Sequence, residues 1–193
     1  FSISVTATNQ VFSISGLPAL PAHLAEGGSL ELTLTFAPVA LGSANATLKI
    51  DTNSFTVSGV GNPPAALPSY SFRGAGGTVE PAQQPAVGIT LAETYPLAVS
   101  GTLNLTFTSE VFANDPAVQF ASGGRSIAFT IPAGSKQAVF ANNATEIRLQ
   151  TGTVAGVISL APSFATQAGG IDLTPQNPPV AVLTVAQSAP RLL

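Results

Sequence analysis

Apolar and polar residues alternate with a period of two along most of this chain. In residues 1–8, the apolar side chains of Phe1, Ile3, Val5 and Ala7 take every second position, with hydroxyl side chains between them. Successive side chains of a β-strand point to opposite faces, whereas those of a helix repeat every 3.6 residues, so this alternation predicts half-buried strands. The pattern recurs at residues 30–36, 45–50 and 54–58. Helical periodicity is almost nowhere sustained, and the chain is therefore predicted to be all-β.

A proline-rich stretch divides the alternating segments into two groups. Residues 63–68 include Pro63, Pro64 and Pro68, which favour an extended linker. We therefore expect one domain at residues 1–62 and a second at residues 69–193. Strand-like segments of the second group lie at residues 69–73, 87–91, 102–108, 117–121, 126–131, 137–141, 146–150, 154–160 and 180–186. Short strands with this spacing predict two tandem antiparallel β-sandwich, immunoglobulin-like domains joined by the linker.

The chain is poor in charge for its length. Only 8% of its 193 residues are charged and the net charge is -3, whereas an average soluble domain carries about 25% charged residues. No basic patch is available to neutralise phosphates, which argues against nucleic-acid binding. No apolar run approaches the roughly 20 residues of a membrane-spanning helix. Cysteine is absent, which excludes disulfides, thiolate nucleophiles and Cys-ligated zinc, and we expect no cofactor.

Hydroxyl and amide side chains take the outward strand positions where lysine and glutamate are common. Thr, Ser, Asn and Gln keep such a face wettable without charge. Lysine on an exposed edge strand is a device against edge-to-edge pairing, and the chain has only Lys49 and Lys136. The sequence therefore predicts sheet edges with little protection, suited to contact with copies of itself or with neighbouring domains.

The first 61 residues contain short strand and turn motifs in a fixed order. The series runs through residues 12–18 (FSISGLP), 24–30 (LAEGGSL), 34–38 (LTFAP), 42–44 (GSA), 47–50 (TLKI) and 57–61 (VSGVG). It resembles the abnormal-spindle/hydin-type immunoglobulin-like domain, although Glu26 stands where that family usually has proline. The resemblance implies a scaffold, adhesion or assembly role in large secreted or surface proteins of bacteria, and it implies no catalytic residues. The second domain resembles no family that we can name.

The first domain is short for its predicted class. An immunoglobulin-like sandwich takes about 100 residues, so part of this one is expected to come from outside the segment. Residues 1–8, with Phe1, Ile3, Val5 and Ala7 on one face, have the pattern of a strand donated to a neighbouring molecule. The alternative is that residues 1–8 form the first strand of their own domain.

Candidate chemistry in the sequence is sparse. The only histidine, His23, lies in a loop, and no Gly-x-Ser-x-Gly motif accompanies it. Glu110 and Asp115 could contribute oxygens to a weak calcium site, although an Asx turn into Pro116 explains Asp115 equally well. We therefore predict no catalytic residue and no other metal ligand.

Two further groups of residues are candidates for modification or binding. Asn45, Asn104 and Asn143 each begin a glycosylation sequon. Sugars usually stack on exposed Trp or Tyr, so the absence of tryptophan argues against carbohydrate binding, and Tyr70 and Tyr95 are the remaining candidates.

These features favour a non-catalytic structural protein, secreted or on the cell surface. The hypothesis is self-association through strand edges into a polymer or fibre, with residues 1–8 as a candidate donor strand. The alternative is an adhesin-like module that binds a ligand or glycan through the loops at residues 74–81 and 110–115, or accessory domains of a larger secreted protein.

Overall fold

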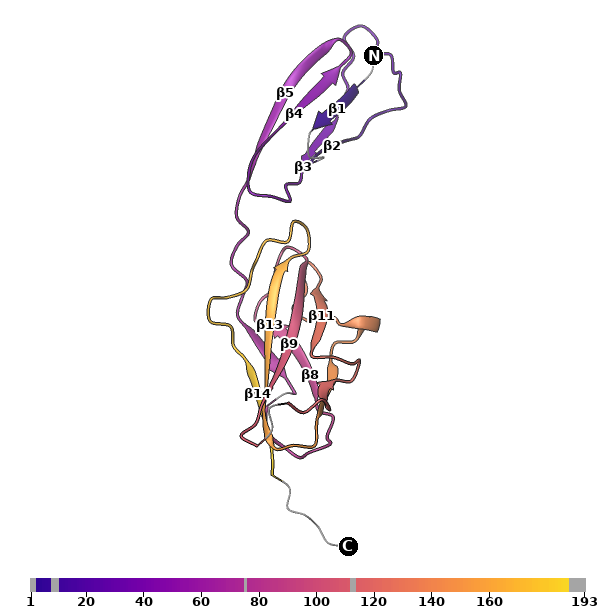
Figure 1. Cartoon of the computed structure of the whole chain (residues 1–193). Coiled ribbons are helices and arrows are strands. Elements are labelled where there is room, and N and C mark those ends of the chain that lie inside the picture. Colours follow the sequence, from indigo (N-terminus) through magenta and orange to yellow (C-terminus); the bar gives the residue numbers. More distant parts are fainter. Residues whose placement is uncertain (1–2, 8–10, 75, 112–113, 188–193) are drawn as a thin grey trace. The chain divides into compact units, whose positions relative to one another are not determined.

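The computed structural model describes residues 3–7, 11–74, 76–111 and 114–187, with backbone only for residues 3–7. The chain is all-β, and it divides into two compact units, residues 1–65 and 66–193 (Figure 1). This division falls inside the proline-rich stretch at residues 63–68. Each unit has a hydrophobic core of its own.

The N-terminal unit holds five strands in two small sheets. They are β1 (Ile3–Ala7), β2 (Phe12–Ser15), β3 (Thr33–Phe36), β4 (Gly42–Ile50) and β5 (Asn53–Gly61). The first sheet has the order β1-β4-β5 and the second pairs β2 with β3, in every case antiparallel. Its core is small, and the buried residues are Val11, Phe12, Ala44 and Ala46. Phe12 stacks on Phe36 with ring centroids 4.8 Å apart.

The C-terminal unit is a sandwich of a four-stranded and a five-stranded sheet. The first has the order β10-β12-β8-β6 and the second β11-β9-β13-β14-β7. The strands are β6 (Tyr70–Arg73), β7 (Gly77–Val79), β8 (Ala86–Leu91), β9 (Val99–Thr108), β10 (Val118–Phe120), β11 (Ser126–Ile131), β12 (Ile147–Thr151), β13 (Gly156–Thr166) and β14 (Ala181–Val185). One continuous core joins the sheets, and Tyr70 of β6 meets Phe164 of β13 with ring centroids 5.0 Å apart.

Strand β7 departs from the antiparallel pattern of the unit. It pairs in parallel with β14, with Gly77 opposite Leu183 and Val79 opposite Val185. The amide of Ala186 extends the pairing by donating to the carbonyl of Val79 at 2.8 Å. The second strand of the unit, β7, and its last described strand, β14, therefore lie side by side in one sheet. This strand falls in the segment that was expected to be a binding loop.

Residues 137–141 are not the strand that their alternation predicts. Gln137 bridges to Thr90 of the four-stranded sheet, and Val139 bridges to Thr130 of the five-stranded sheet. The segment crosses from one sheet to the other, so neither ladder extends beyond a single bridge, and a short 3-10 turn, Ala141–Asn143, follows.

Strand β13 runs past the predicted end at residue 160 and includes Pro162. Pairing with β14 stops at Leu160, whereas pairing with β9 continues to Thr166. The amide of Phe164 points away from β9, to the hydroxyl of Thr174 at 2.9 Å. Pro162 lies two residues earlier and so faces the same way, which means that its missing N–H removes no bond to β9.

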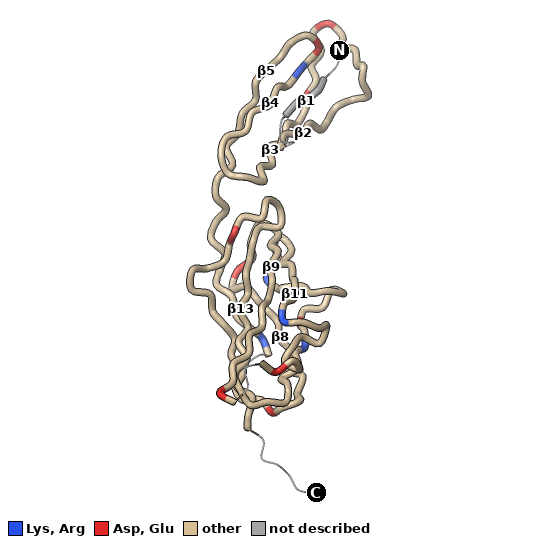
Figure 2. The backbone as a smooth tube through the Cα atoms, in the orientation of Figure 1, with Lys and Arg blue, Asp and Glu red and all other residues tan. Residues whose placement is uncertain are grey.

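Charge is nearly absent from the strands. Among the described strands, the charged residues are Lys49, Arg73 and Arg148. The five-stranded sheet and β5 carry none. In Figure 2 most of the strand backbone is tan, the colour of residues other than Lys, Arg, Asp and Glu. The predicted uncharged strand surfaces are therefore present.

Candidate functional site

Strand β5 forms an open edge of the N-terminal unit. It is nine residues long, Asn53–Gly61, and the order β1-β4-β5 leaves one of its sides without a neighbour in the described part of the chain. An unpaired strand side presents a row of backbone N–H and C=O groups that another strand can bind. We call this side of Asn53–Gly61 the β5 edge.

The hairpin between β4 and β5 fixes which residues face outward. A two-residue turn separates Ile50 from Asn53, and the two are opposed in the register. Across so tight a turn they must be a hydrogen-bonded pair, and hydrogen-bonded and non-bonded pairs then alternate along the strands. Asn53, Phe55, Val57, Gly59 and Gly61 therefore bond to β4. The backbone groups of Ser54, Thr56, Ser58 and Val60 point to the open side.

Nothing on the β5 edge repels an approaching strand. The side chains of Ser54, Thr56, Ser58 and Val60 are all exposed, and none is charged. Val60 is 60% exposed and Phe55, on the opposite face, is 50% exposed. The β5 edge therefore combines free backbone groups with uncovered apolar surface, and it lacks the lysine or proline that commonly blocks pairing.

On the inward face of the same strand, the ring of Phe36 fills the space beside Gly59. A Cβ on Gly59 would lie 2.5 Å from the ring of Phe36, so this ring covers the position where a side chain would stand. The carbonyl of Ala40 and the Cβ of Pro38 lie against Gly61 in the same way. The inward face near Gly59 is therefore flat and aromatic.

The edges of the C-terminal unit are shorter or covered. In the described residues, β6 has four residues and β7 and β10 have three each. The six-residue β11 is bridged on its outer side, where the amide of Thr130 donates to Val139 at 2.9 Å and Val139 donates back at 2.7 Å. Short and covered edges resist pairing, and β5, with nine residues, is the longest of the described edge strands.

The predicted donor strand lies in its own sheet. Ile3–Ala7 forms β1 and pairs with β4, with Ile3 opposite Ile50, Val5 opposite Leu48 and Ala7 opposite Ala46. This arrangement is the alternative that the sequence left open. Phe1 lies outside the described residues, and donation of β1 to a neighbour stays a prediction.

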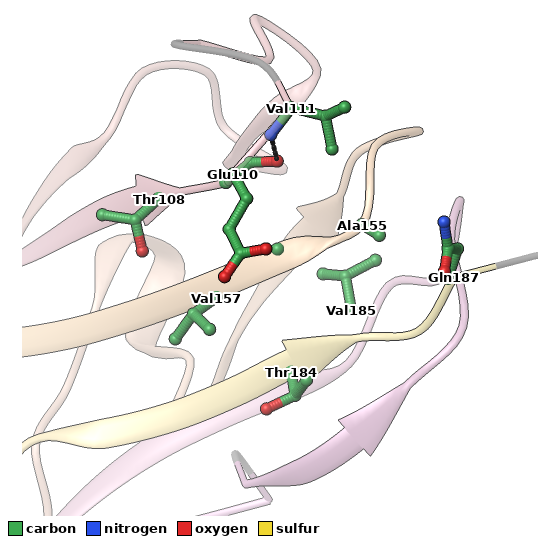
Figure 3. A pocket seen from close by; sticks show the side chains of 10 residues that line it. Thr108, Glu110, Val111, Ala155, Val157, Thr184, Val185 and Gln187 are labelled. Carbon is green, nitrogen blue, oxygen red and sulfur yellow. Dashed lines mark hydrogen bonds between the residues drawn. The ribbon is translucent and has the colours of Figure 1, made fainter.

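A groove of about 480 Å³ lies at one end of the five-stranded sheet (Figure 3). Its lining includes Thr108 from β9, Val157 from β13 and Thr184 from β14. Glu110 is the one charged residue among its lining side chains, and Val111, 75% exposed, stands at its rim. The groove is thus lined by apolar, hydroxyl and amide groups with one carboxylate, and it contains part of the loop predicted to bind a ligand.

Asp115 is a buried structural carboxylate. It is 4% exposed, and it accepts hydrogen bonds from the amides of Thr153 at 2.7 Å, Ala117 at 2.9 Å and Val154 at 3.1 Å. Burial alone would raise the pKa of Asp115, but the hydrogen bonds from Thr153, Ala117 and Val154 outweigh it and lower the pKa. The bond to Ala117 is the Asx turn that the sequence indicated. Both carboxylate oxygens are thereby engaged by protein donors.

The remaining predicted site residues lie apart. Glu110 is exposed, and no group of three or more His, Cys, Asp or Glu side chains in the described residues could hold a metal, so the weak calcium site stays a prediction. His23 is exposed, as are Asn45 in β4, Asn104 in β9 and Asn143 in the 3-10 turn. Glycosylation of the three asparagines is likewise untested.

The prediction that Tyr70 and Tyr95 stack on a sugar is wrong. Tyr70 is 6% exposed and Tyr95 is 2% exposed. The hydroxyl of Tyr70 donates to the carbonyl of Pro179 at 2.7 Å, and burial raises its pKa to about 12. Both tyrosines belong to the hydrophobic core of the C-terminal unit.

The sequence missed the β5 edge as a single site. The alternation at residues 54–58 predicted the strand itself. Its position at the edge depends on strand order, for which the local sequence carries no signal. The absence of charge along the strand was the one available clue.

Comparisons with known proteins give weak likenesses. No family model and no curated protein matches the chain. The structure of the Yersinia pseudotuberculosis adhesin InvE is similar at 12% sequence identity with a TM-score of 0.40, over 95% of this chain and 48% of that chain. Domains 4 and 5 of the S-layer protein SbsC are similar at 13% identity with a TM-score of 0.31, over 92% of this chain and 72% of that chain. The chain thus spans about half of the adhesin chain, 48%. No helix among the described residues is long and apolar enough to cross a membrane.

Proposed function

We propose that this chain is a non-catalytic structural module of a secreted or cell-surface protein, and that it associates with a neighbouring protein chain through the β5 edge. The N-terminal unit would belong to the abnormal-spindle/hydin-type immunoglobulin-like domains, in line with its sequence motifs. The partner is another copy of the chain or a neighbouring domain of a larger surface protein.

The β5 edge is the observation that carries this proposal. Nine residues of open strand without a charge are a template for strand addition, in which backbone hydrogen bonds supply affinity. The described edges of the C-terminal unit are short or bridged. A module whose edges are protected in one unit and open in the other is suited to association at one defined place.

A charge placed on the edge tests the proposal. Ser58 is exposed and its backbone groups point outward, so Ser58→Lys sets an ammonium group beside an incoming strand without touching the bonds to β4. Light scattering over a range of protein concentrations measures the mean mass. We expect the mass of the parent chain to rise with concentration and that of Ser58→Lys to stay at the monomer value.

Ser163→Lys is the matched control. Ser163 is exposed on β13, which at this point pairs with β9 on one side and is bridged by residues 172–174 on the other, and the substitution changes the net charge equally. It should associate as the parent does. A parent chain that stays monomeric at every concentration, or a Ser58→Lys variant that associates as well as the control, would contradict the proposal.

The groove beside Glu110 supports a second candidate function, the binding of a ligand or glycan. Its volume of about 480 Å³ falls within the roughly 300–1,000 Å³ of small-molecule sites. A glycan array probed with the parent chain and with Glu110→Gln tests this candidate. Saturable binding that Glu110→Gln weakens would support it, and an array without saturable binding would refute it.

A further inference from the structure

We infer that the partner of the β5 edge is the β5 edge of a second copy, paired antiparallel about a two-fold axis at Val57. This inference rests on the proposed function and names the partner and the register. The result is one continuous sheet with the strand order β1-β4-β5-β5-β4-β1 across the two copies. Three features of β5 agree on it.

Strand length selects the register. When two antiparallel copies of a nine-residue strand pair along their whole length, the fifth residue lies opposite itself. In Asn53–Gly61 the fifth residue is Val57. Every other register leaves part of the strand unpaired or brings a strand residue opposite a turn.

The direction of the backbone groups agrees with this register. Pairing about Val57 places Thr56 opposite Ser58 and Ser54 opposite Val60. All four are the residues whose N–H and C=O groups point to the open side, so each facing pair exchanges both hydrogen bonds. Facing Thr and Ser side chains also hydrogen-bond across antiparallel strands.

Side-chain shape agrees as well. Pairing about Val57 sets Phe55, 50% exposed in the single chain, opposite Gly59 of the second copy. Gly59 has no side chain to oppose it, and the ring of Phe36 lies over that position. Phe55 therefore packs against the aromatic ring of the partner, and an aromatic residue across from glycine is a known stabilising pair in sheets.

The symmetry has a consequence for assembly. A two-fold contact uses the same surface on both copies and closes after two chains, whereas a head-to-tail contact continues into a filament. The short and bridged edges of the C-terminal unit offer no second strand contact of comparable length in the described residues. The β5 edge by itself therefore yields a dimer and not a fibre.

Disulfide trapping reads the register directly. The chain has no cysteine, so an introduced one is the only thiol present. Thr56→Cys and Ser58→Cys are mixed in equal amounts, oxidised mildly and weighed by mass spectrometry, which distinguishes the mixed dimer from each homodimer. Facing hydrogen-bonded residues have Cα atoms about 5.5 Å apart, within the roughly 4.4–6.8 Å that a disulfide spans.

The three products correspond to three registers. Pairing about Val57 joins position 56 to position 58 and gives mainly the mixed dimer, above about 80% of the linked product, against about half for random contact. A register centred on Thr56 or on Ser58 instead gives the corresponding homodimer. Ser54→Cys alone is the control, because the two positions 54 then lie about 20 Å apart and cannot be linked.

The outcomes separate this inference from the proposed function. A majority of the mixed dimer, with no linked Ser54→Cys, supports the two-fold register. A majority of either homodimer, or open polymers of the parent chain in light scattering, overturns the register and leaves association at the edge standing. No linked product from any variant, together with a monomeric parent, overturns both.

Discussion

Replacing Asp115 with alanine should strongly destabilise the C-terminal unit. The carboxylate is 4% exposed and accepts three backbone N–H bonds, from Thr153, Ala117 and Val154. A buried donor left without an acceptor costs about 1–3 kcal/mol, and water admitted to the new space relieves part of it. At about 1 kcal/mol for each donor, Asp115→Ala lowers the free energy of unfolding by about 3 kcal/mol.

The chain contains a natural probe for this measurement. Both tyrosines, Tyr70 and Tyr95, are buried in the C-terminal unit, and there is no tryptophan. Tyrosine fluorescence during urea unfolding therefore reports on that unit alone. With a denaturant slope of about 1.5–2 kcal/mol per molar, the loss of about 3 kcal/mol lowers the urea midpoint by roughly 1.5–2 M.

The effect should depend on pH in a definite direction. Because hydrogen bonding lowers the pKa of Asp115 in the folded chain, its contribution is fully present above the unfolded pKa, which is about 3.9. It is lost as the pH falls through the folded pKa. The difference in stability between the parent and Asp115→Ala should therefore be constant near neutral pH and shrink below about pH 4.

An exposed carboxylate provides the control. Asp172 also accepts an amide bond, from Thr174 at 2.9 Å, but its side chain is in solvent. Asp172→Ala should change the urea midpoint far less than Asp115→Ala does. Equal shifts for the two variants, or a gap that does not shrink in acid, would refute the argument from buried donors. A parent chain that gains stability from added calcium would point instead to the predicted metal site.

Three further predictions test other parts of the chain. Gly152 has a φ of +73° and a Cβ there would contact the Asp115 carboxylate, so Gly152→Ala should cost about 2 kcal/mol in the same urea assay. Tyr70→Phe loses the bond to Pro179 and about 1 kcal/mol at neutral pH. Because burial raises the pKa of Tyr70 to about 12, the parent should also lose stability between about pH 10 and 12 more than this variant does. Phe36→Ala removes one of the two stacked rings of the N-terminal unit and should destabilise that unit by about 3 kcal/mol or more. Association should then be lost, while the tyrosine fluorescence of the C-terminal unit is unchanged.

The period-two alternation predicted the strands well because the side-chain phase of a strand is a local property. Residues 126–131 are β11 as predicted, and residues 87–91 fall within β8. The failure at residues 137–141 has a non-local cause, since that segment alternates like a strand but spans the gap between two sheets. Strand β13 also runs past its predicted end at residue 160, and the hydrogen bonds beside Pro162 show why the strand can continue.

The candidate sites were less predictable than the strands. The Asx turn at Asp115 is local and the sequence indicated it, but its bonds to Thr153 and Val154 join residues 38 and 39 positions away. Asn53–Gly61 pairs with β4 in a local hairpin, and its other side is open because β1 pairs with the far side of β4, a long-range contact that sets the strand order. Sequence patterns of this kind therefore identify strands but not which of those strands lie at the edge of a sheet.

The parallel pairing of β7 with β14 gives the C-terminal unit a mechanical property. Tension that pulls the chain backward from β7 and forward from β14 slides the two strands along each other, since they run in the same direction. The bonds between them, including that from Ala186 to Val79, are then loaded together and must break at once. In a hairpin pulled from its two ends, the bonds would open one after another. The pairing of β7 with β14 therefore acts as a clamp that resists stretching along these two strands.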